Sequence, residues 1–340
     1  MIDEIQAALD NLLHGRDLRP EQMRDAVWAI MDDRASEAAI ASLLTALKIK
    51  GEAVDEIVGA VEALRQRCTP IPVQQAQLLD TCGTGGDSLH TFNISTATAI
   101  VAAATGIPVA KHGNRSVSSS SGSADVLERL GVNLQLTVDQ VAACIDEVGI
   151  GFCFAQLFHG AMKYAAPVRK ELGFRTIFNL VGPLSNPAGA KYQLVGANRP
   201  DTAEKLARAL SQLGCQSAVV VCGAGELDEV SLWGETSAFR VHDGQVAPVS
   251  WTAESFGLPE CRVADLQVNS PEESAAVIES ILKGEKGPRR DIVVANVAAA
   301  LLAAEKTDDL QQGVQSACAA IDNGRAADML SRLIEVSNRD

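Results

Sequence analysis

The chain has 340 residues, of which 47% are hydrophobic and 21% are charged, so it is long enough for two domains and apolar enough for a sizeable core. Its 29 Lys and Arg against 43 Asp and Glu give a formal net charge of −14. Because an acidic surface without a long basic run repels nucleic acid, that class of partner is disfavoured. A polyanionic ligand would have to be held by cations, backbone amides and metal ions gathered locally.

The cysteines are predicted to be buried thiols of a reducing compartment. They lie in apolar segments and show neither a CxxC pair nor metal-finger spacing: Cys68, Cys82, Cys144, Cys153, Cys215, Cys222, Cys261 and Cys318. The acidic start of the chain is unlike a signal peptide, and apolar stretches such as 98–110 are too short to span a bilayer. We therefore expect a cytoplasmic protein with no membrane partner.

Residues 2–67 are predicted to form helices only. Apolar residues recur at helical spacing in successive stretches, with Pro20 at a favoured first helical position and Ser36 as a cap. Gly15 and Gly51 end two of these stretches. Residues 69–72, with two prolines, predict an extended linker.

From residue 78 the pattern changes to short apolar runs that alternate with helical segments, which predicts a mostly parallel α/β sheet. The predicted strands are 78–82, 107–110, 150–154, 192–196 and 217–222. The predicted helices are 95–105, 123–130, 137–147, 201–213, 272–283 and 291–304. Within residues 228–250, two short β-type runs flank Asp243-Gly244, which predicts an antiparallel hairpin.

The glycine-rich loop at residues 83–87 follows the first predicted strand, and residues 93–96 lead from it into an alanine-rich helix. A strand, a glycine turn and a helix N-terminus together form an anion site, because backbone N–H groups converge there and the helix dipole adds positive charge. Ligands of open α/β sheets lie at such strand ends. The glycines are expected because a Cβ would occupy the ligand's space. In the simpler alternative the loop is only a turn.

A second polar cluster, at residues 110–128, follows the next predicted strand. Lys111, His112 and Arg115 are cationic or potentially cationic, and hydroxyl-bearing serines and two glycines lie beside them. This composition predicts a second phosphate cradle that faces the first. The simpler alternative is a solvated serine loop. Two cradles fit a ligand with two separated phosphate groups.

Asp228 and Glu229 follow the predicted strand at 217–222. Adjacent carboxylates at a strand end are suited to Mg²⁺, which takes carboxylate oxygens and bridges to ligand phosphates, and the Ser95 hydroxyl is a further candidate ligand. A lone Asp-Glu pair is more often an exposed turn, so the metal interpretation depends on a phosphorylated ligand.

Residues 155–187 supply one further candidate, Arg169, which lies in an aromatic and aliphatic setting where a guanidinium can take a carboxylate bidentately. Lys163 and Lys170 are expected to be surface charges, and His159 to be structural rather than a base.

Together these motifs resemble the anthranilate phosphoribosyltransferase family, and they match in order along essentially the whole chain. The matching motifs are Gly83-Thr84-Gly85-Gly86-Asp87, Asn93-Ile94-Ser95-Thr96, Lys111-His112-Gly113-Asn114-Arg115, Gly122-Ser123-Ala124-Asp125, Pro167-Val168-Arg169, Phe178-Asn179, Gly182-Pro183-Leu184 and Asp228-Glu229. A single glycine loop would be a weak signal, whereas this series of motifs is specific.

The resemblance implies an α/β fold of the nucleoside phosphorylase and phosphoribosyltransferase type, with a small all-helical N-terminal domain and a larger α/β domain with a mostly parallel central sheet. Residues 1–70 with part of 165–190 would form the helical domain, on the side of the acceptor and of a homodimer interface. Residues 73–340 would bind the phosphoribosyl donor.

The implied reaction transfers the phosphoribosyl group of 5-phosphoribosyl 1-diphosphate to the amine of anthranilate, in tryptophan biosynthesis. The implied donor-binding residues are Gly83, Gly86, Asp87, Thr91, Asn93, Ile94, Ser95, Thr96, Lys111, His112, Gly113, Asn114, Arg115, Ser116, Val117, Ser118, Ser119 and Ser123. Gly83, Asn114 and Arg169 would contact anthranilate, and Ser95, Asp228 and Glu229 would hold two Mg²⁺. The resemblance implies no acid–base catalyst; Lys111, Arg169, Asp228 and Glu229 would act by positioning and electrostatics.

Some positions depart from commoner family members. Phe158-His159-Gly160 stands where His-His-Pro often lies, Tyr164 stands where histidine is frequent, and Gln156 replaces a common proline. These positions are expected to flank the anthranilate channel.

Two alternatives share the implied architecture. A pyrimidine nucleoside phosphorylase is disfavoured by the Arg169 region and the Asp228-Glu229 pair, since phosphorolysis needs no diphosphate-bound metal. A non-catalytic nucleic-acid-binding relative is disfavoured by the net charge of −14 and by the intact carboxylate pair.

Overall fold

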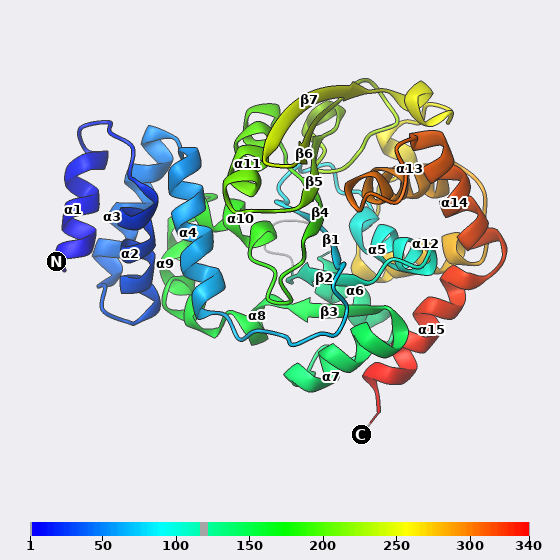
Figure 1. Ribbon diagram of the computed structural model, residues 1–340, viewed down its shortest axis with the longest axis horizontal. Coiled ribbons are helices and arrows are strands. Elements are labelled where there is room, and N and C mark those ends of the chain that lie inside the picture. The colour runs from blue at the N-terminus through cyan, green and yellow to red at the C-terminus, as the bar shows by residue number, and fades with distance from the viewer. Residues whose placement is uncertain (1, 116–121, 340) are drawn as a thin grey trace.

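A computed structural model describes residues 2–115 and 122–339 of the chain, which form a helical bundle beside a larger α/β part (Figure 1). Ser116, Val117, Ser118 and Ser119, which the resemblance implies as donor ligands, lie outside the described residues.

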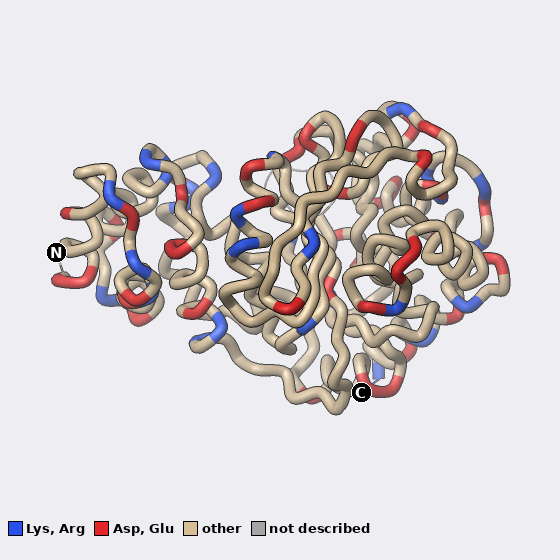
Figure 2. The backbone as a smooth tube through the Cα atoms, turned by 45° about the horizontal axis from the view of Figure 1, so that its top comes forward, with Lys and Arg blue, Asp and Glu red and all other residues tan. Residues whose placement is uncertain are grey.

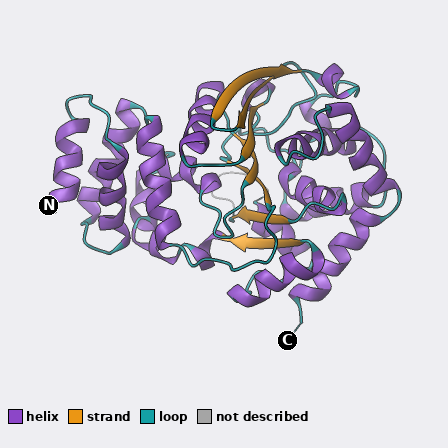
Figure 3. Ribbon diagram, viewed as in Figure 1, coloured by secondary structure: helices purple, strands orange, loops and turns teal. Residues whose placement is uncertain are grey.

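The first part of the chain contains only helices in its described residues, as predicted from the helical spacing (Figure 3). These helices are α1 (Asp3–Leu12), α2 (Pro20–Met31), α3 (Glu37–Lys50) and α4 (Val54–Arg67). Pro20 opens α2, and the Ser36 hydroxyl accepts the Ala39 N–H at 3.3 Å and so caps α3. Both helix starts are therefore where the sequence predicts them.

The described strands form one seven-stranded sheet in the order β3-β2-β1-β4-β5-β6-β7. The strands are β1 (Leu79–Gly83), β2 (Val109–Gly113), β3 (Ile150–Phe154), β4 (Tyr192–Gly196), β5 (Ser217–Cys222), β6 (Thr236–His242) and β7 (Gln245–Trp251). Strands β1 to β5 pair in parallel, and β6 and β7 form an antiparallel hairpin at the edge, as predicted. Gly83 pairs with Gly196, so β1 and β4 end level with each other.

Strand β2 continues further than the sequence predicts. Its predicted end was residue 110, whereas Lys111, His112 and Gly113 still pair with β3. The hydrophobic pattern ends at the first charged residue, but Lys111 and His112 are buried, so their backbone polar groups must be hydrogen-bonded. Lys111 and His112 are therefore strand residues and not loop residues.

Helices follow or separate the strands. They are α5 (Ile94–Ala104), α6 (Ser123–Arg129), α7 (Val138–Ala143), α8 (Ala155–Phe158), α9 (Ala166–Leu172), α10 (Ile177–Val181), α11 (Pro200–Gln212), α12 (Pro271–Leu282), α13 (Pro288–Ala303), α14 (Leu310–Asp322) and α15 (Arg325–Ser337). The helix predicted at 137–147 continues beyond α7 as a π-helical turn, Cys144–Val148. The sequence did not predict α14 and α15. Helix α14 approaches α13 closely at Gly313, where a Cβ would lie 2.8 Å from the Ala298 Cα, and it also buries Val314 and Ile321 in the same core.

Both faces of the parallel sheet are covered by helices, which is the general condition for parallel sheets. Along β5 the side chains alternate, so that Val219 and Val221 face a core with α5 and α13, and Val220 and Cys222 face a core shared with α11. The second core continues through α11 into α1–α4. The sheet therefore contributes one face to the core of the helical bundle.

The segment between β3 and β4 crosses from the sheet to the helical bundle. Its helices α9 and α10 pack against α3 and α4 (Figure 1). Residues on this segment consequently reach the sheet from the side of the bundle.

In the described ranges, no helix is both long enough and apolar enough to cross a bilayer. Figure 2 shows Lys and Arg dispersed among Asp and Glu over both parts of the described chain.

Asp80 on β1 ties together the strand ends that carry the candidate site. Its carboxylate is fully buried and accepts the His112 N–H at 2.9 Å and the Asn186 side-chain amide at 2.8 Å. The same Asn186 amide also donates to the Ala110 carbonyl at 2.7 Å. Burial raises the pKa of Asp80 to about 6, against the opposing effect of the Lys111 charge.

We predict that Asp80→Asn changes how stability depends on pH. The pKa of Asp80 is higher in the folded protein than the usual 3.8, so the folded protein binds a proton on this carboxyl group more tightly than the unfolded chain does. The stability that this protonation contributes is therefore lost as the pH rises from about 4 to about 6. Urea unfolding across this range should show wild-type stability falling relative to Asp80→Asn. The exposed Asp308→Asn variant should follow the wild type. Parallel curves for wild type and Asp80→Asn would contradict this account.

Candidate active site

A cavity of about 320 Å³ lies at the carboxyl ends of β1 and β2, and nearly all of the described residues that the sequence singled out meet in its wall. These residues are Gly83, Gly86, Asp87, Thr91, Asn93, Ile94, Ser95, Lys111, His112, Gly113, Asn114, Arg115, Ser123, Arg169, Asp228 and Glu229. Thr96 is outside this wall. It is fully buried in α5, and its N–H donates to the Asn93 side chain, which caps the helix, at 2.9 Å.

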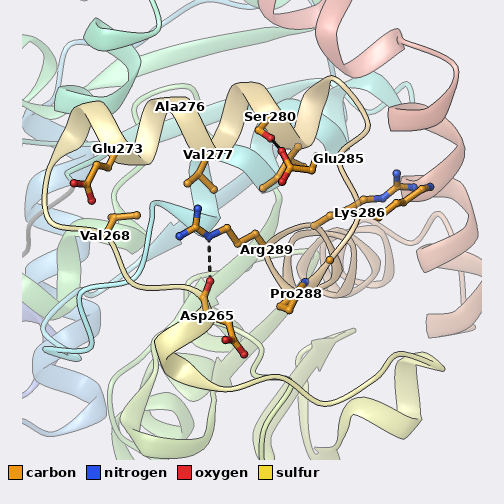
Figure 4. A pocket seen from close by; sticks show the side chains of 13 residues that line it. Asp265, Val268, Glu273, Ala276, Val277, Ser280, Glu285, Lys286, Pro288 and Arg289 are labelled. Carbon is orange, nitrogen blue, oxygen red and sulfur yellow. Dashed lines mark hydrogen bonds between the residues drawn. The ribbon is translucent and has the colours of Figure 1, made fainter.

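A larger cavity, of about 670 Å³, lies between α12 and the start of α13, and no residue singled out from the sequence lines it (Figure 4). Its charged side chains bond to neighbours: Arg289 donates to the Asp265 carbonyl at 3.0 Å, and Arg290 and Lys286 both pair with Asp322. Ser280 hydrogen-bonds to Glu285. We therefore assign the chemistry to the smaller cavity.

The loop at 265–268 beside the larger cavity supports the segment that follows the glycine loop. The Phe92 N–H donates to the Leu266 carbonyl at 3.0 Å, and the Val268 N–H donates to the His90 carbonyl at 2.9 Å. On α12, the Ser274 hydroxyl accepts the Asn93 N–H at 2.9 Å. Residues 90–93 are thus held from behind, and their other side faces the candidate site.

The protein's own groups hold the glycine loop. The Gly85 N–H donates to the Asp228 carboxylate at 2.6 Å, and Arg175 donates to the carbonyls of Thr84, at 2.8 Å, and of Gly85. A Cβ on Gly83 would lie 2.2 Å from the Asp228 carboxylate, and one on Gly86 would overlap the Arg175 guanidinium. The expectation that these glycines leave space for the ligand is therefore wrong in this structure, because the space belongs to the side chains of Asp228 and Arg175.

Three carboxyl groups crowd beside this loop. Burial, together with the charge of Asp87, raises the pKa of Asp228 to about 6. Burial and the neighbouring Asp228 also raise the pKa of Glu229, and burial raises that of Asp87. Clustered carboxyl groups with raised pKa values are stabilised by a bound cation. In the described chain, no three Asp, Glu, His or Cys side chains are arranged to hold a metal by themselves, so a metal here would need further oxygens from a ligand.

The predicted cations of the second cluster already have partners. The buried Lys111 ammonium donates to the Thr81 carbonyl at 2.6 Å and to the Ser95 hydroxyl at 3.2 Å. Arg115 pairs with Asp125 at 2.9 Å and with Glu128 at 3.0 Å near the surface.

His112 is not a cation near neutral pH. Burial and the neighbouring His159 lower its pKa to about 3. The centres of the two imidazole rings are 5.2 Å apart, and His159, which is also buried, lies outside the cavity wall. His112 therefore contributes a neutral ring to the site, and His159 supports it from behind.

Arg169, on α9, presents a guanidinium that pairs with no acidic side chain of the described residues. It donates to the Asn179 side-chain oxygen at 3.5 Å, and it lies 5.5 Å from the centre of the Phe178 ring. Burial lowers its pKa, and no neighbouring carboxylate opposes this shift. A partly buried arginine without a counter-ion is suited to a ligand carboxylate or phosphate.

Comparison with known proteins identifies the family. Models of the glycosyl transferase family match residues 6–68 as the helical bundle domain and residues 75–327 as the a/b domain. The anthranilate phosphoribosyltransferase of Moorella thermoacetica is 47% identical to this chain over 330 residues, which is 97% of each protein. The chain belongs to the anthranilate phosphoribosyltransferase family.

Solved structures of this family have the same fold. The Thermus thermophilus anthranilate phosphoribosyltransferase superimposes with a TM-score of 0.92 at 40% identity, covering 99% of this chain and 100% of that one. The Saccharomyces cerevisiae anthranilate phosphoribosyltransferase, in complex with PRPP and Mg, gives a TM-score of 0.90 at 26% identity, covering 98% of this chain and 97% of that one. The anthranilate phosphoribosyltransferase family is thus supported over the phosphorylase and nucleic-acid-binding alternatives.

The departures from the commoner family sequence lie mostly behind the site. Phe158, His159 and Tyr164 are not among the described residues that line the cavity. Gln156 approaches more closely, because its side-chain amide donates to the Asn114 side chain at 3.3 Å.

Sequence reasoning missed Arg175, which lies 90 residues from Gly85 in the chain. A single arginine after Gly173 and Phe174 looks like an ordinary surface-loop residue. Only the crossing of the 155–187 segment toward the glycine loop places it in the cavity wall.

We predict that Gly83→Ala lowers kcat/KM for phosphoribosyl transfer at least about tenfold, equivalent to about 1.4 kcal/mol. The new Cβ would overlap the Asp228 carboxylate and push it from its contact with Gly85. Gly160→Ala, where a Cβ meets open space, is the matched control and should keep wild-type kinetics. Equal kinetics of the two variants would contradict the proposed crowding.

Proposed function

We propose that this cavity is where the phosphoribosyl group of 5-phosphoribosyl 1-diphosphate is transferred to the amine of anthranilate, with release of diphosphate, in tryptophan biosynthesis. The observation that carries the proposal is the meeting of three features in one cavity: the glycine loop, the crowded carboxyl groups, and the guanidinium of Arg169, which has no acidic partner among the described residues. A diphosphate with its metal fits the first two features, and the carboxylate of an aromatic acid fits the third.

Ser95, Asp228 and Glu229 would hold Mg²⁺, and we propose two ions per site, as the resemblance implies. The crowding of Asp228 and Glu229 supports a cation at this place, and the S. cerevisiae relative is solved with PRPP and Mg. When bound, Mg²⁺ neutralises charge that develops on the diphosphate leaving group.

The donor would lie along the glycine loop and the start of α5. Ile94 and Ser95 open this helix toward the cavity, and the positive end of its dipole favours a phosphate there. The Gly86 N–H has no protein partner among the described residues and is available to a phosphate oxygen. The remaining donor contacts proposed are Gly83, Asp87, Thr91, Asn93, Lys111, His112, Gly113, Asn114, Arg115, Ser116, Val117, Ser118, Ser119 and Ser123, whereas Thr96 supports the start of α5 from within the core.

Anthranilate would bind with its carboxylate on Arg169 and with contacts to Gly83 and Asn114. Phe178 and Pro183 also line the cavity and offer apolar surface to an aromatic ring. The chain then works by holding the neutral amine in line with the anomeric carbon, and well-held reactants can gain roughly 7–11 kcal/mol in this way. The lowered pKa of His112, about 3, makes it a poor base near neutral pH, so positioning and electrostatics remain the main contributions.

We further propose that residues 1–70 with part of 165–190 form a helical domain, which supplies the acceptor side of the site and the contact of a homodimer. Residues 73–340 would hold the donor. We propose that the protein acts in the cytoplasm. Leu13 at the end of α1 and Ile49 in α3 are 75% and 82% exposed, and α1 and α3 pack together. Exposed apolar side chains on one small bundle support a contact with a second copy.

The proposed activity is tested by following the loss of anthranilate fluorescence. We expect decay when the purified protein is mixed with anthranilate, 5-phosphoribosyl 1-diphosphate and Mg²⁺, and none when a chelator removes the metal. No decay at high protein concentration with Mg²⁺ present would refute the proposed activity, and undiminished decay in chelator would refute the metal's part in it.

We predict that Arg169→Ala raises the KM for anthranilate at least about tenfold, because a charge-assisted bidentate contact is lost. The KM for the donor should stay within about twofold. Lys170→Ala, which removes an exposed cation from the same helix, is the matched control. Equal rises in both KM values would count against this role for Arg169.

A further inference from the structure

Arg175 links the two parts of the molecule at the most constrained loop of the site. It lies between α9 and α10, which pack against α3 and α4 of the helical bundle. Its guanidinium reaches the glycine loop and lines the cavity. Arg175 therefore connects the segment proposed to bind the acceptor with the glycine loop proposed to bind the donor.

The contact fixes the direction of two successive peptide groups. Arg175 donates from one guanidinium nitrogen to the Thr84 carbonyl and from the other to the Gly85 carbonyl. Because the C=O and N–H of a trans peptide point in opposite directions, the N–H groups of Gly85 and Gly86 are turned away from Arg175. The Gly85 N–H meets Asp228, and the Gly86 N–H remains without a protein partner among the described residues.

The loop could not hold this shape by local preference alone. Gly85 and Gly86 both have positive φ, of 67° and 86°, and two flexible glycines in succession leave an unsupported loop free to adopt many other conformations. The peptide group between residues 84 and 85 is hydrogen-bonded on both sides, by Arg175 at its carbonyl and by Asp228 at its N–H. The Asn198 side chain donates to the Gly86 carbonyl at 3.2 Å. Arg175 makes two of these contacts.

Arg175 is not committed to an acidic partner. No ion pair joins it to a carboxylate in the described chain, although the charges of Asp228 and Asp87 both favour its protonated form. The guanidinium is therefore used on carbonyl oxygens, and it also places a positive charge beside the crowded carboxyl groups.

We propose that Arg175 is a positioning residue for the phosphoribosyl donor, which acts through the glycine loop by holding the Thr84 and Gly85 carbonyls so that the Gly86 N–H faces the diphosphate. This assignment rests on the proposed function. It also gives the helical side of the molecule a direct part in donor binding. The role needs the planar two-pronged guanidinium and not only a positive charge, since an ammonium group is a single point.

The test compares Arg175→Gln, Arg175→Lys and the matched control Lys170→Gln in the full-length protein. We expect both Arg175 variants to raise the donor KM about tenfold or more, because contacts from a charged donor are lost, while the anthranilate KM stays within about twofold. Titration calorimetry with the donor and Mg²⁺ should show the same loss of affinity without turnover. Lys170→Gln should match the wild type in all measurements.

Hydrogen exchange provides a readout that does not depend on turnover. We expect faster exchange of the amides at 84–87 in both Arg175 variants, with unchanged Tm and unchanged exchange in α1–α4. An unchanged donor KM in Arg175→Gln, or full recovery in Arg175→Lys, would overturn the proposal. A general loss of protection with a lowered Tm would also overturn it, by showing a merely structural role. If the wild type itself fails to transfer phosphoribose, the proposed function fails, while exchange at 84–87 still tests the contact.

Discussion

The crowding of carboxyl groups at the carboxyl edge of the sheet is the constraint on which the rest of the site depends. Asp228 lies where it does because two strands end in glycine: a Cβ on Gly83 would meet its carboxylate, and one on Gly196 would lie within 1.6 Å of its carbonyl oxygen. That approach buries Asp228 against the loop, beside Asp87 and Glu229, and raises the pKa of all three groups. Charge repulsion is thus built into the fold, and a ligand that brings cations relieves it.

The sheet also couples the two parts of the molecule. Because its side chains alternate between two cores, the helical bundle packs through α11 on the same strands that carry the site. Polar contacts repeat this connection: Arg65 of α4 donates to the Leu184 carbonyl at 2.9 Å, and Lys205 of α11 donates to the Glu52 carbonyl at 2.9 Å. Arg169 and Arg175 belong to the segment that crosses between the parts, so proposed acceptor and donor contacts share one support.

Local sequence patterns correctly predicted the structural features that depend on residues close together in the chain. The β-branched run of β5, the Ser36 cap and the antiparallel hairpin all follow from short-range preferences and were confirmed. Patterns failed where distant contacts decide. Lys111 continues a strand because its ammonium is satisfied by groups on other elements, and α14 approaches α13 at Gly313, a residue type that apolar patterns do not count as a core position. Arg175 carries no local signal at all. The motifs located the cavity, but they could not show which polar groups were already bonded to one another.

Which polar groups are already bonded to one another decides how a highly charged donor can bind to an acidic chain. Lys111 is already hydrogen-bonded to Thr81 and Ser95, and Arg115 would have to leave Asp125 and Glu128 to meet a phosphate. Side-chain cations alone therefore offer the diphosphate little free positive charge. Backbone N–H groups of the glycine loop and of α5 supply partial charges, and the carboxyl cluster attracts metal ions. A donor that arrives with its metal satisfies both the phosphates and the carboxylates, whereas the free diphosphate would meet the carboxylates' repulsion. Arg169, which has no acidic partner among the described residues, is free for the proposed contact with the acceptor's carboxylate.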